Sequence, residues 1–151
     1  MPANQTPIAV RVVGQPQDRS IDLVVIHCSA TPSGKPLQLG KPDDLAYQNA
    51  PKIINAWHAA RGFRRQTADV RAFNPLLPSI GYHYVIDLDG QIWAGRALKE
   101  VGAHAAGFNA HSIGICLIGG VEREAKYTAA QWASLRDRVT MLHEELSIPL
   151  T

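Results

Sequence analysis

The chain of 151 residues carries 15 Lys and Arg against 13 Asp and Glu, a formal net charge of +2. With 46% hydrophobic and 19% charged residues, its composition is that of one folded domain and excludes a disordered or fibrous chain. The small positive charge is not the clustered basic excess that binders of nucleic-acid phosphates need, so we expect no nucleic-acid partner.

The amino-terminal region gives no sign of a membrane anchor or a secretory signal. No apolar run approaches the roughly 18 residues of a membrane span, and residues 1–20 lack the charged and apolar segments of a signal peptide. We interpret 1–20 as a flexible arm ahead of one domain, 21–151. Cys28 and Cys116 lie in apolar runs, which favours buried thiols. We therefore expect no membrane partner and a cytoplasmic location as synthesised.

The first part of the domain is predicted to contain a strand, a loop and a helix. A β-branched run over 21–27 barely alternates, which predicts a strand buried on both faces. Prolines and glycines over 32–46 indicate a loop. A helix is predicted over 48–61, ended by Gly62. Its apolar face is predicted to consist of Ile53, Ile54, Trp57 and Ala60.

The middle of the chain combines an irregular segment with a hairpin. Residues 63–80 are rich in Arg and have no hydrophobic period, so we predict a long surface insertion there. Two strand-like runs, 82–87 and 91–95, flank Asp89-Gly90, which predicts a β-hairpin. Regular alternation along the first run would place the side chains of Tyr82 and Tyr84 on one face.

The last part of the domain is predicted to be a buried strand over 112–118 and then a helix. Thr128 fits the N-cap of a helix that runs to about Glu145, with Trp132, Leu135, Val139, Leu142 and Leu146 on its apolar face. Strands with helices before, between and after them predict an α/β (α+β) fold with a mixed sheet covered by helices.

Three residues stand out as candidates for chemistry. His27 ends a predicted strand, where α/β sheets often place ligands, but a hydrogen-bonded core histidine fits the position equally well. His104 lies in a loop of Gly and Ala that a ligand could approach closely, and it also fits an ordinary loop residue. Tyr82 fits either a site or a core position. Phosphate-binding loops, a G-x-S-x-G elbow and C-x-x-C pairs are absent from the sequence, which argues against nucleotide, serine-hydrolase and thiol-redox chemistry.

A series of short motifs follows in order along the chain. They are VIHCSAT at 25–31, WH at 57–58 with GF at 62–63, GYHY at 81–84, DG at 89–90 with AGR at 94–96, VGAHAAGFN at 101–109 and SIGICLIGG at 112–120. Together they resemble the zinc-dependent N-acetylmuramoyl-L-alanine amidases, the family of phage lysozyme-type amidases and peptidoglycan recognition proteins. The match covers roughly 21–146, interrupted by the insertion, and the phage or prophage endolysin branch is the most similar.

The resemblance implies hydrolysis of the amide between N-acetylmuramic acid and L-alanine in peptidoglycan, through a water that zinc activates. It also implies a mixed sheet flanked by helices. It assigns His27 as a zinc ligand, Tyr82 as a catalytic residue, and His104, Asn109 and His58 as substrate-binding residues. Zinc polarises a carbonyl and makes its bound water more acidic, and a phenol can stabilise the oxyanion that forms.

One part of the family pattern has no counterpart in this sequence. The resemblance places the two remaining zinc ligands after the last long helix, where only 147–151 follow. We therefore expect an incomplete zinc site, with a catalytically incompetent peptidoglycan- or muropeptide-binding or regulatory domain as the alternative to an active amidase. A missing final strand would also leave an unpaired sheet edge that favours a dimer. Action on the cell wall would require export or lysis.

Overall fold

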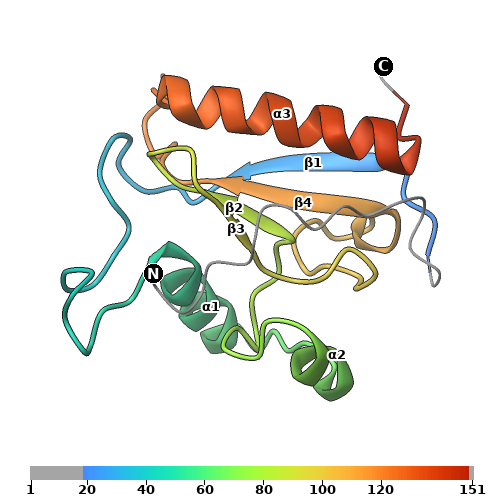
Figure 1. The fold of residues 1–151 in the computed structure, drawn as a ribbon, viewed down its shortest axis with the longest axis horizontal. Helices are drawn as coiled ribbons and strands as arrows, with labels where there is room; N and C mark the ends of the chain where they lie inside the picture. Colours follow the sequence, from blue (N-terminus) through green and yellow to red (C-terminus); the bar gives the residue numbers. More distant parts are fainter. Residues whose placement is uncertain (1–18, 150–151) are drawn as a thin grey trace.

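A computed structural model describes residues 19–149, so residues 1–18 of the predicted arm lie outside the described part. Helix α3 covers one face of the sheet, and α1 and α2 lie on the other side (Figure 1). This arrangement confirms the predicted mixed sheet flanked by helices. The elements are β1 (Leu23–Cys28), α1 (Ala50–Ala60), α2 (Thr67–Ala72), β2 (Tyr84–Ile86), β3 (Ile92–Ala94), the 3-10 turn η1 (Asn109–His111), β4 (Ser112–Leu117) and α3 (Ala129–Leu146).

The strands are ordered β1-β4-β2-β3, with β4 parallel to both of its neighbours and β2 antiparallel to β3. In this register His27 lies beside Cys116. Strand β4 is buried throughout, as predicted, but β1 is an edge strand and is only half-buried. The prediction that β1 is buried on both faces was wrong: among residues 19–149 it pairs only with β4, and Ile26 is 47% exposed.

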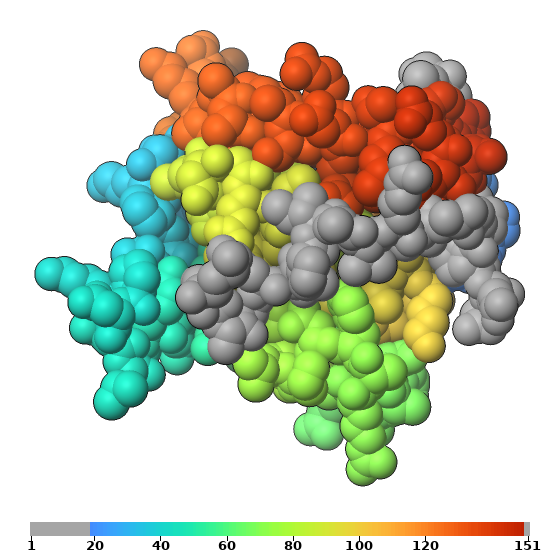
Figure 2. Space-filling model, viewed as in Figure 1, coloured from blue at the N-terminus to red at the C-terminus, as the bar shows by residue number. Residues whose placement is uncertain are grey.

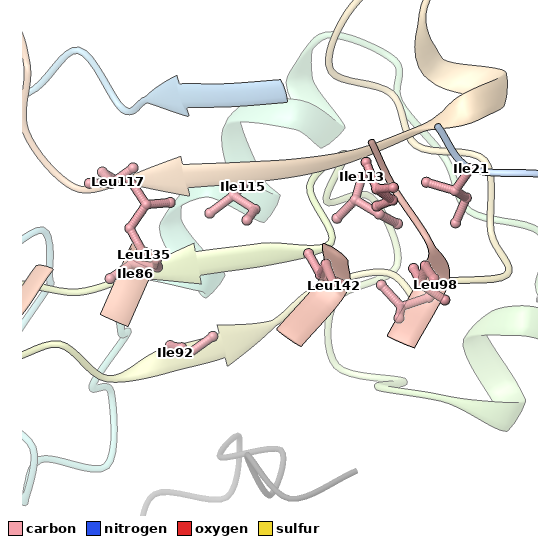
Figure 3. Packing of buried hydrophobic residues seen from close by; sticks show 11 residues of the cluster. Ile21, Ile86, Ile92, Leu98, Ile113, Ile115, Leu117, Leu135 and Leu142 are labelled. Atoms are coloured by element: carbon pink, nitrogen blue, oxygen red, sulfur yellow. The ribbon is translucent and has the colours of Figure 1, made fainter. Parts of the chain in front are cut away.

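Two hydrophobic clusters form the core, one on each side of the sheet. Figure 3 shows the cluster beneath α3, where Leu135 and Leu142 pack against Ile86, Ile113 and Ile115. The Thr128 N-cap is confirmed, since Thr128 and Gln131 form a reciprocal capping box. Trp132 is 54% exposed, contrary to prediction.

The buried face of helix α1 matches the prediction only in part: Ile53 and Ile54 are buried, but Trp57 and Ala60 are exposed. Asn49 caps its first turn by accepting from the Lys52 N–H at 3.1 Å. Ala50, Ile54 and His58, spaced four residues apart, are buried, whereas Trp57 is 42% exposed. The correction matters for function because it turns His58 toward the interior of the domain.

The predicted hairpin is present, with Gly90 at a φ of +84° in its turn. Strand β2 begins only at Tyr84, and Tyr82 precedes it. Consequently the two tyrosines do not share a face: Tyr84 packs on the α3 side and Tyr82 on the α1 side.

The segment 63–80 is anchored rather than loosely attached, and it contains α2. The buried Arg65 guanidinium donates to the carbonyl oxygens of Phe73 (2.7 Å), Asn74 (2.9 Å) and Leu77 (3.1 Å). It also forms two hydrogen bonds, 2.8 and 2.9 Å long, to the Glu100 carboxylate. A buried ion pair of this kind is stable only with such complete hydrogen bonding, and here it fixes the insertion to the loop that precedes the site.

The loop between β1 and α1 projects from one end of the molecule, in cyan in Figure 2. Among residues 19–149, no helix combines the length and the hydropathy needed to cross a lipid bilayer.

Candidate functional site

Four of the five predicted site residues come together where β1 ends and the hairpin begins. The ring of Tyr82 lies 5.2 Å from the ring of His27 and 5.2 Å from that of His58, measured between centroids. The His27 Nε2 and His104 Nδ1 atoms are 2.9 Å apart. These side chains therefore form one cluster although they come from four separate segments of the chain.

A cavity of about 300 Å³ adjoins this cluster. Its lining includes His58, Phe63, Tyr82, His104 and Asn109, so it contains all of the predicted substrate-binding residues. A polar recess of this size with several titratable groups on its wall is the usual form of an active or binding site.

His58 has a fixed tautomer. Its Nδ1 accepts a hydrogen bond from the Gly81 N–H at 2.8 Å, so in the neutral ring the proton is on Nε2. Burial, helped by the nearby guanidinium groups of Arg61 and Arg96, lowers the pKa of His58 to about 4. At neutral pH His58 is therefore an uncharged hydrogen-bond donor at the edge of the cavity.

The phenol of Tyr82 stays protonated at neutral pH. Burial raises its pKa well above the ordinary value of a tyrosine, and the adjacent Cys116 thiol raises it further. A neutral phenol can donate a hydrogen bond to an oxyanion. Because it keeps its proton at this pH, it cannot serve as a general base.

The loop that carries His104 is held by Asn109. The N–H groups of His104 and Ala105 both donate to the Asn109 side-chain oxygen at 2.9 Å. The His104 ring lies flat over Gly114, where a Cβ atom would come within 2.6 Å of the ring. Asn109 lines the cavity, and its side-chain oxygen accepts the two hydrogen bonds that shape the loop.

Sequence analysis missed two residues that support the site. His83 is fully buried; its Nδ1 accepts from the Gly114 N–H at 3.0 Å and its Nε2 donates to the Glu100 carbonyl at 2.8 Å. Arg19, which falls in the predicted arm, donates to the carbonyl oxygens of Leu98 and Ser112 at 2.8–2.9 Å. These contacts are with distant backbone groups, which no local sequence pattern indicates.

The side chains around His27 offer some, but not all, of the ligands that a zinc ion needs. Burial lowers the pKa of His27, which leaves the ring neutral and able to bind a metal. His104 is the second imidazole at this position. Catalytic zinc normally has three protein ligands, and within residues 19–149 no three His, Cys, Asp or Glu side chains are grouped to hold a metal. The described residues therefore do not make a complete zinc site.

Comparison with known proteins identifies the family. The sequence profile of the N-acetylmuramoyl-L-alanine amidase family matches residues 17–151 of this chain. The chain is 35% identical to the endolysin of Escherichia phage T7 over 130 residues, which cover 83% of this chain and 69% of the endolysin. The chain belongs to the N-acetylmuramoyl-L-alanine amidase family.

Solved structures agree with this assignment. The endolysin amidase LysCS of Clostridium intestinale is 26% identical with a TM-score of 0.62, over 87% of this chain and 66% of LysCS. Peptidoglycan recognition protein-LE, solved with tracheal cytotoxin, a monomeric peptidoglycan, shares the fold at 23% identity and a TM-score of 0.59, over 91% of this chain and 76% of that protein. The chain spans about two thirds of the length of the phage T7 endolysin and of LysCS.

Proposed function

We propose that the chain is an N-acetylmuramoyl-L-alanine amidase that hydrolyses the amide between N-acetylmuramic acid and L-alanine in the cell wall. The observation that supports this most directly is the cluster of His27, Tyr82 and His104 beside a cavity, in a member of this amidase family. Peptidoglycan or a muropeptide is the proposed ligand of the cavity.

The neutral side chains around the cavity have different proposed roles. The Nε2–H of His58 is a hydrogen-bond donor that suits the carbonyl oxygen of the scissile amide and the oxyanion that develops from it. The hydroxyl of Tyr82 contacts the buried Cys116 thiol and would donate to the same oxygen on leaving that contact. His104, held close to Gly114, and Asn109 also line the cavity and would orient the muramoyl-peptide.

We propose His27 as one ligand of a zinc ion, the metal on which this family's chemistry depends. Its neutral ring and its place beside Tyr82 support that role. Because residues 19–149 hold no group of three suitable ligands, we assign no step of the reaction to the metal.

That same observation favours a second candidate function, which is binding of muropeptide without hydrolysis. The cavity and its hydrogen-bond donors are built from residues 19–149, whereas three metal ligands are not found among them. A binding or regulatory domain would need the cavity and its hydrogen-bond donors but not the metal ligands.

Release of stem peptides from purified sacculi distinguishes the two functions. An amidase releases peptides with a free L-alanine amino group; His27→Ala should abolish this release and Tyr82→Phe should slow it about 100-fold, the usual cost of losing one oxyanion donor. Binding to insoluble peptidoglycan without any release would support the second candidate. Unchanged release by the His27→Ala protein would remove His27 from the mechanism.

The proposal also includes self-association through β1. The N–H groups of Ser29 and Thr31 donate to Leu117 and Gly119, so the alternate residues Val24 and Ile26 direct their backbone groups away from β4. A second copy of β1 could pair antiparallel with this edge and cover Ile26.

A further inference from the structure

The insertion 63–80 forms a second cavity next to the first. Its volume is about 500 Å³, and its lining includes Phe63, Arg64, Val70, Arg71 and Ser79. The Phe63 ring belongs to both cavities and packs against His58, with ring centroids 5.0 Å apart. The two recesses are therefore neighbours that share one aromatic wall.

The second cavity carries positive charge without a compensating acid. Its three arginines are Arg64, Arg65 and Arg71, and no carboxylate lines it. Arg65 is neutralised by its bonds to Glu100. Arg64 and Arg71 are exposed, and within residues 19–149 neither forms an ion pair. Among the described residues these two guanidinium groups therefore have no ionic partner, although Arg64 also lines a neighbouring recess with Asp69 and Glu100.

The frame that holds these arginines is rigid. The Arg65 guanidinium bonds the carbonyl groups of Phe73, Asn74 and Leu77, and the Asn74 side chain donates to the carbonyl of Ala94 at 2.7 Å. The backbone around Arg64 and Arg71 is therefore set before any ligand arrives, which lowers the entropy cost of binding.

We propose that this second cavity binds the carboxylates of the stem peptide, through Arg64 and Arg71, while the scissile amide lies in the first cavity. This inference rests on the proposed function and specifies which part of the substrate the insertion recognises. A peptide that leads away from the amide past Phe63 covers about 10 Å in three residues, and Phe63 lines both cavities. Its carboxylates match guanidinium groups in charge and in planar, two-pronged geometry.

The test measures binding of the free stem peptide, which is a reaction product and cannot be cleaved again. Calorimetry compares this peptide with the same peptide in which every carboxylate is amidated, using the full chain. The Arg64→Gln/Arg71→Gln protein should bind the free peptide about tenfold more weakly than the unmodified chain and should bind the amidated peptide equally well.

The matched control is Arg123→Gln/Arg136→Gln, which removes two exposed arginines outside both cavities and so makes the same change in net charge. Its affinity for the free peptide should stay the same. The inference is overturned if the unmodified chain does not bind the free peptide, if it binds both peptides equally, or if the two double variants weaken binding alike. Failure of the proposed function gives a different result, since it abolishes peptide release from sacculi while leaving this charge-dependent binding measurable.

Discussion

Acidification should destabilise the protein well before its carboxylates are protonated, because two buried histidines are held neutral. Burial lowers the pKa of His58 to about 4 and that of His83 to about 3. The unfolded chain binds these protons near pH 6.5 and the folded chain does not, so stability is complete above pH 6.5 and falls as the pH falls toward 4.

The size of the effect follows from these pKa values. Between pH 7 and pH 5, a histidine whose pKa drops from 6.5 to about 4 or below lowers the free energy of unfolding by about 2 kcal/mol. The two together remove about 4 kcal/mol, a large part of the roughly 5–15 kcal/mol that stabilises a typical domain. Burial also lowers the pKa of His104 to about 4 and lowers that of His27, so these two half-buried groups add to the loss. The raised pKa of Asp87, a result of its burial, acts in the opposite direction at lower pH, so the measurement stays above pH 5.

Urea unfolding followed by tryptophan fluorescence at several pH values measures this slope. The variant His58→Asn isolates one of the two groups, because the Asn side-chain oxygen can accept from the Gly81 N–H as Nδ1 does, yet the side chain does not titrate. Its loss of stability between pH 7 and pH 5 should be about 2 kcal/mol smaller than that of the unmodified chain. An equal loss in both proteins, or no loss in either, would refute the reasoning.

Three further predictions concern the site and the sheet edge. Gly114→Ala should push the His104 ring away from His27, because the added Cβ would lie 2.6 Å from that ring. The rate of peptide release by this variant should therefore fall by a larger factor than its free energy of unfolding in urea. After dialysis against a chelator, elemental analysis should find less than one zinc per chain, because residues 19–149 group no three ligands; one zinc per chain would contradict this. Ile26→Lys should shift any dimer seen by analytical ultracentrifugation to monomer, and an unchanged dimer would exclude the β1 edge as its interface.

Local patterns predicted the elements whose formation depends on neighbouring residues. The Asp89-Gly90 turn and the Thr128 cap form through groups within a few positions of one another, and both are present. The family resemblance assigned His27, Tyr82 and His104 to one site, and these side chains lie together.

The errors concern burial, which depends on what packs against an element. The apolar run of β1 does not reveal that only one edge of the strand is paired, and the choice between Trp57 and His58 on α1 depends on Gly81, 23 residues away in the chain. Likewise, an Arg-rich segment suggests a solvated surface, and nothing local shows that Arg65 is enclosed by carbonyl groups and Glu100.

Glu100 connects the insertion 63–80 to the loop that carries His104. Its carboxylate binds Arg65 in the insertion and accepts from the Ala97 N–H, and its carbonyl oxygen accepts from His83 beneath the His104 loop. The insertion and the loop therefore cannot diverge independently: relatives that lose the acid at this position should also have lost the arginine that it neutralises. A change at Glu100 would therefore disturb the proposed stem-peptide cavity and the support of the His104 loop together.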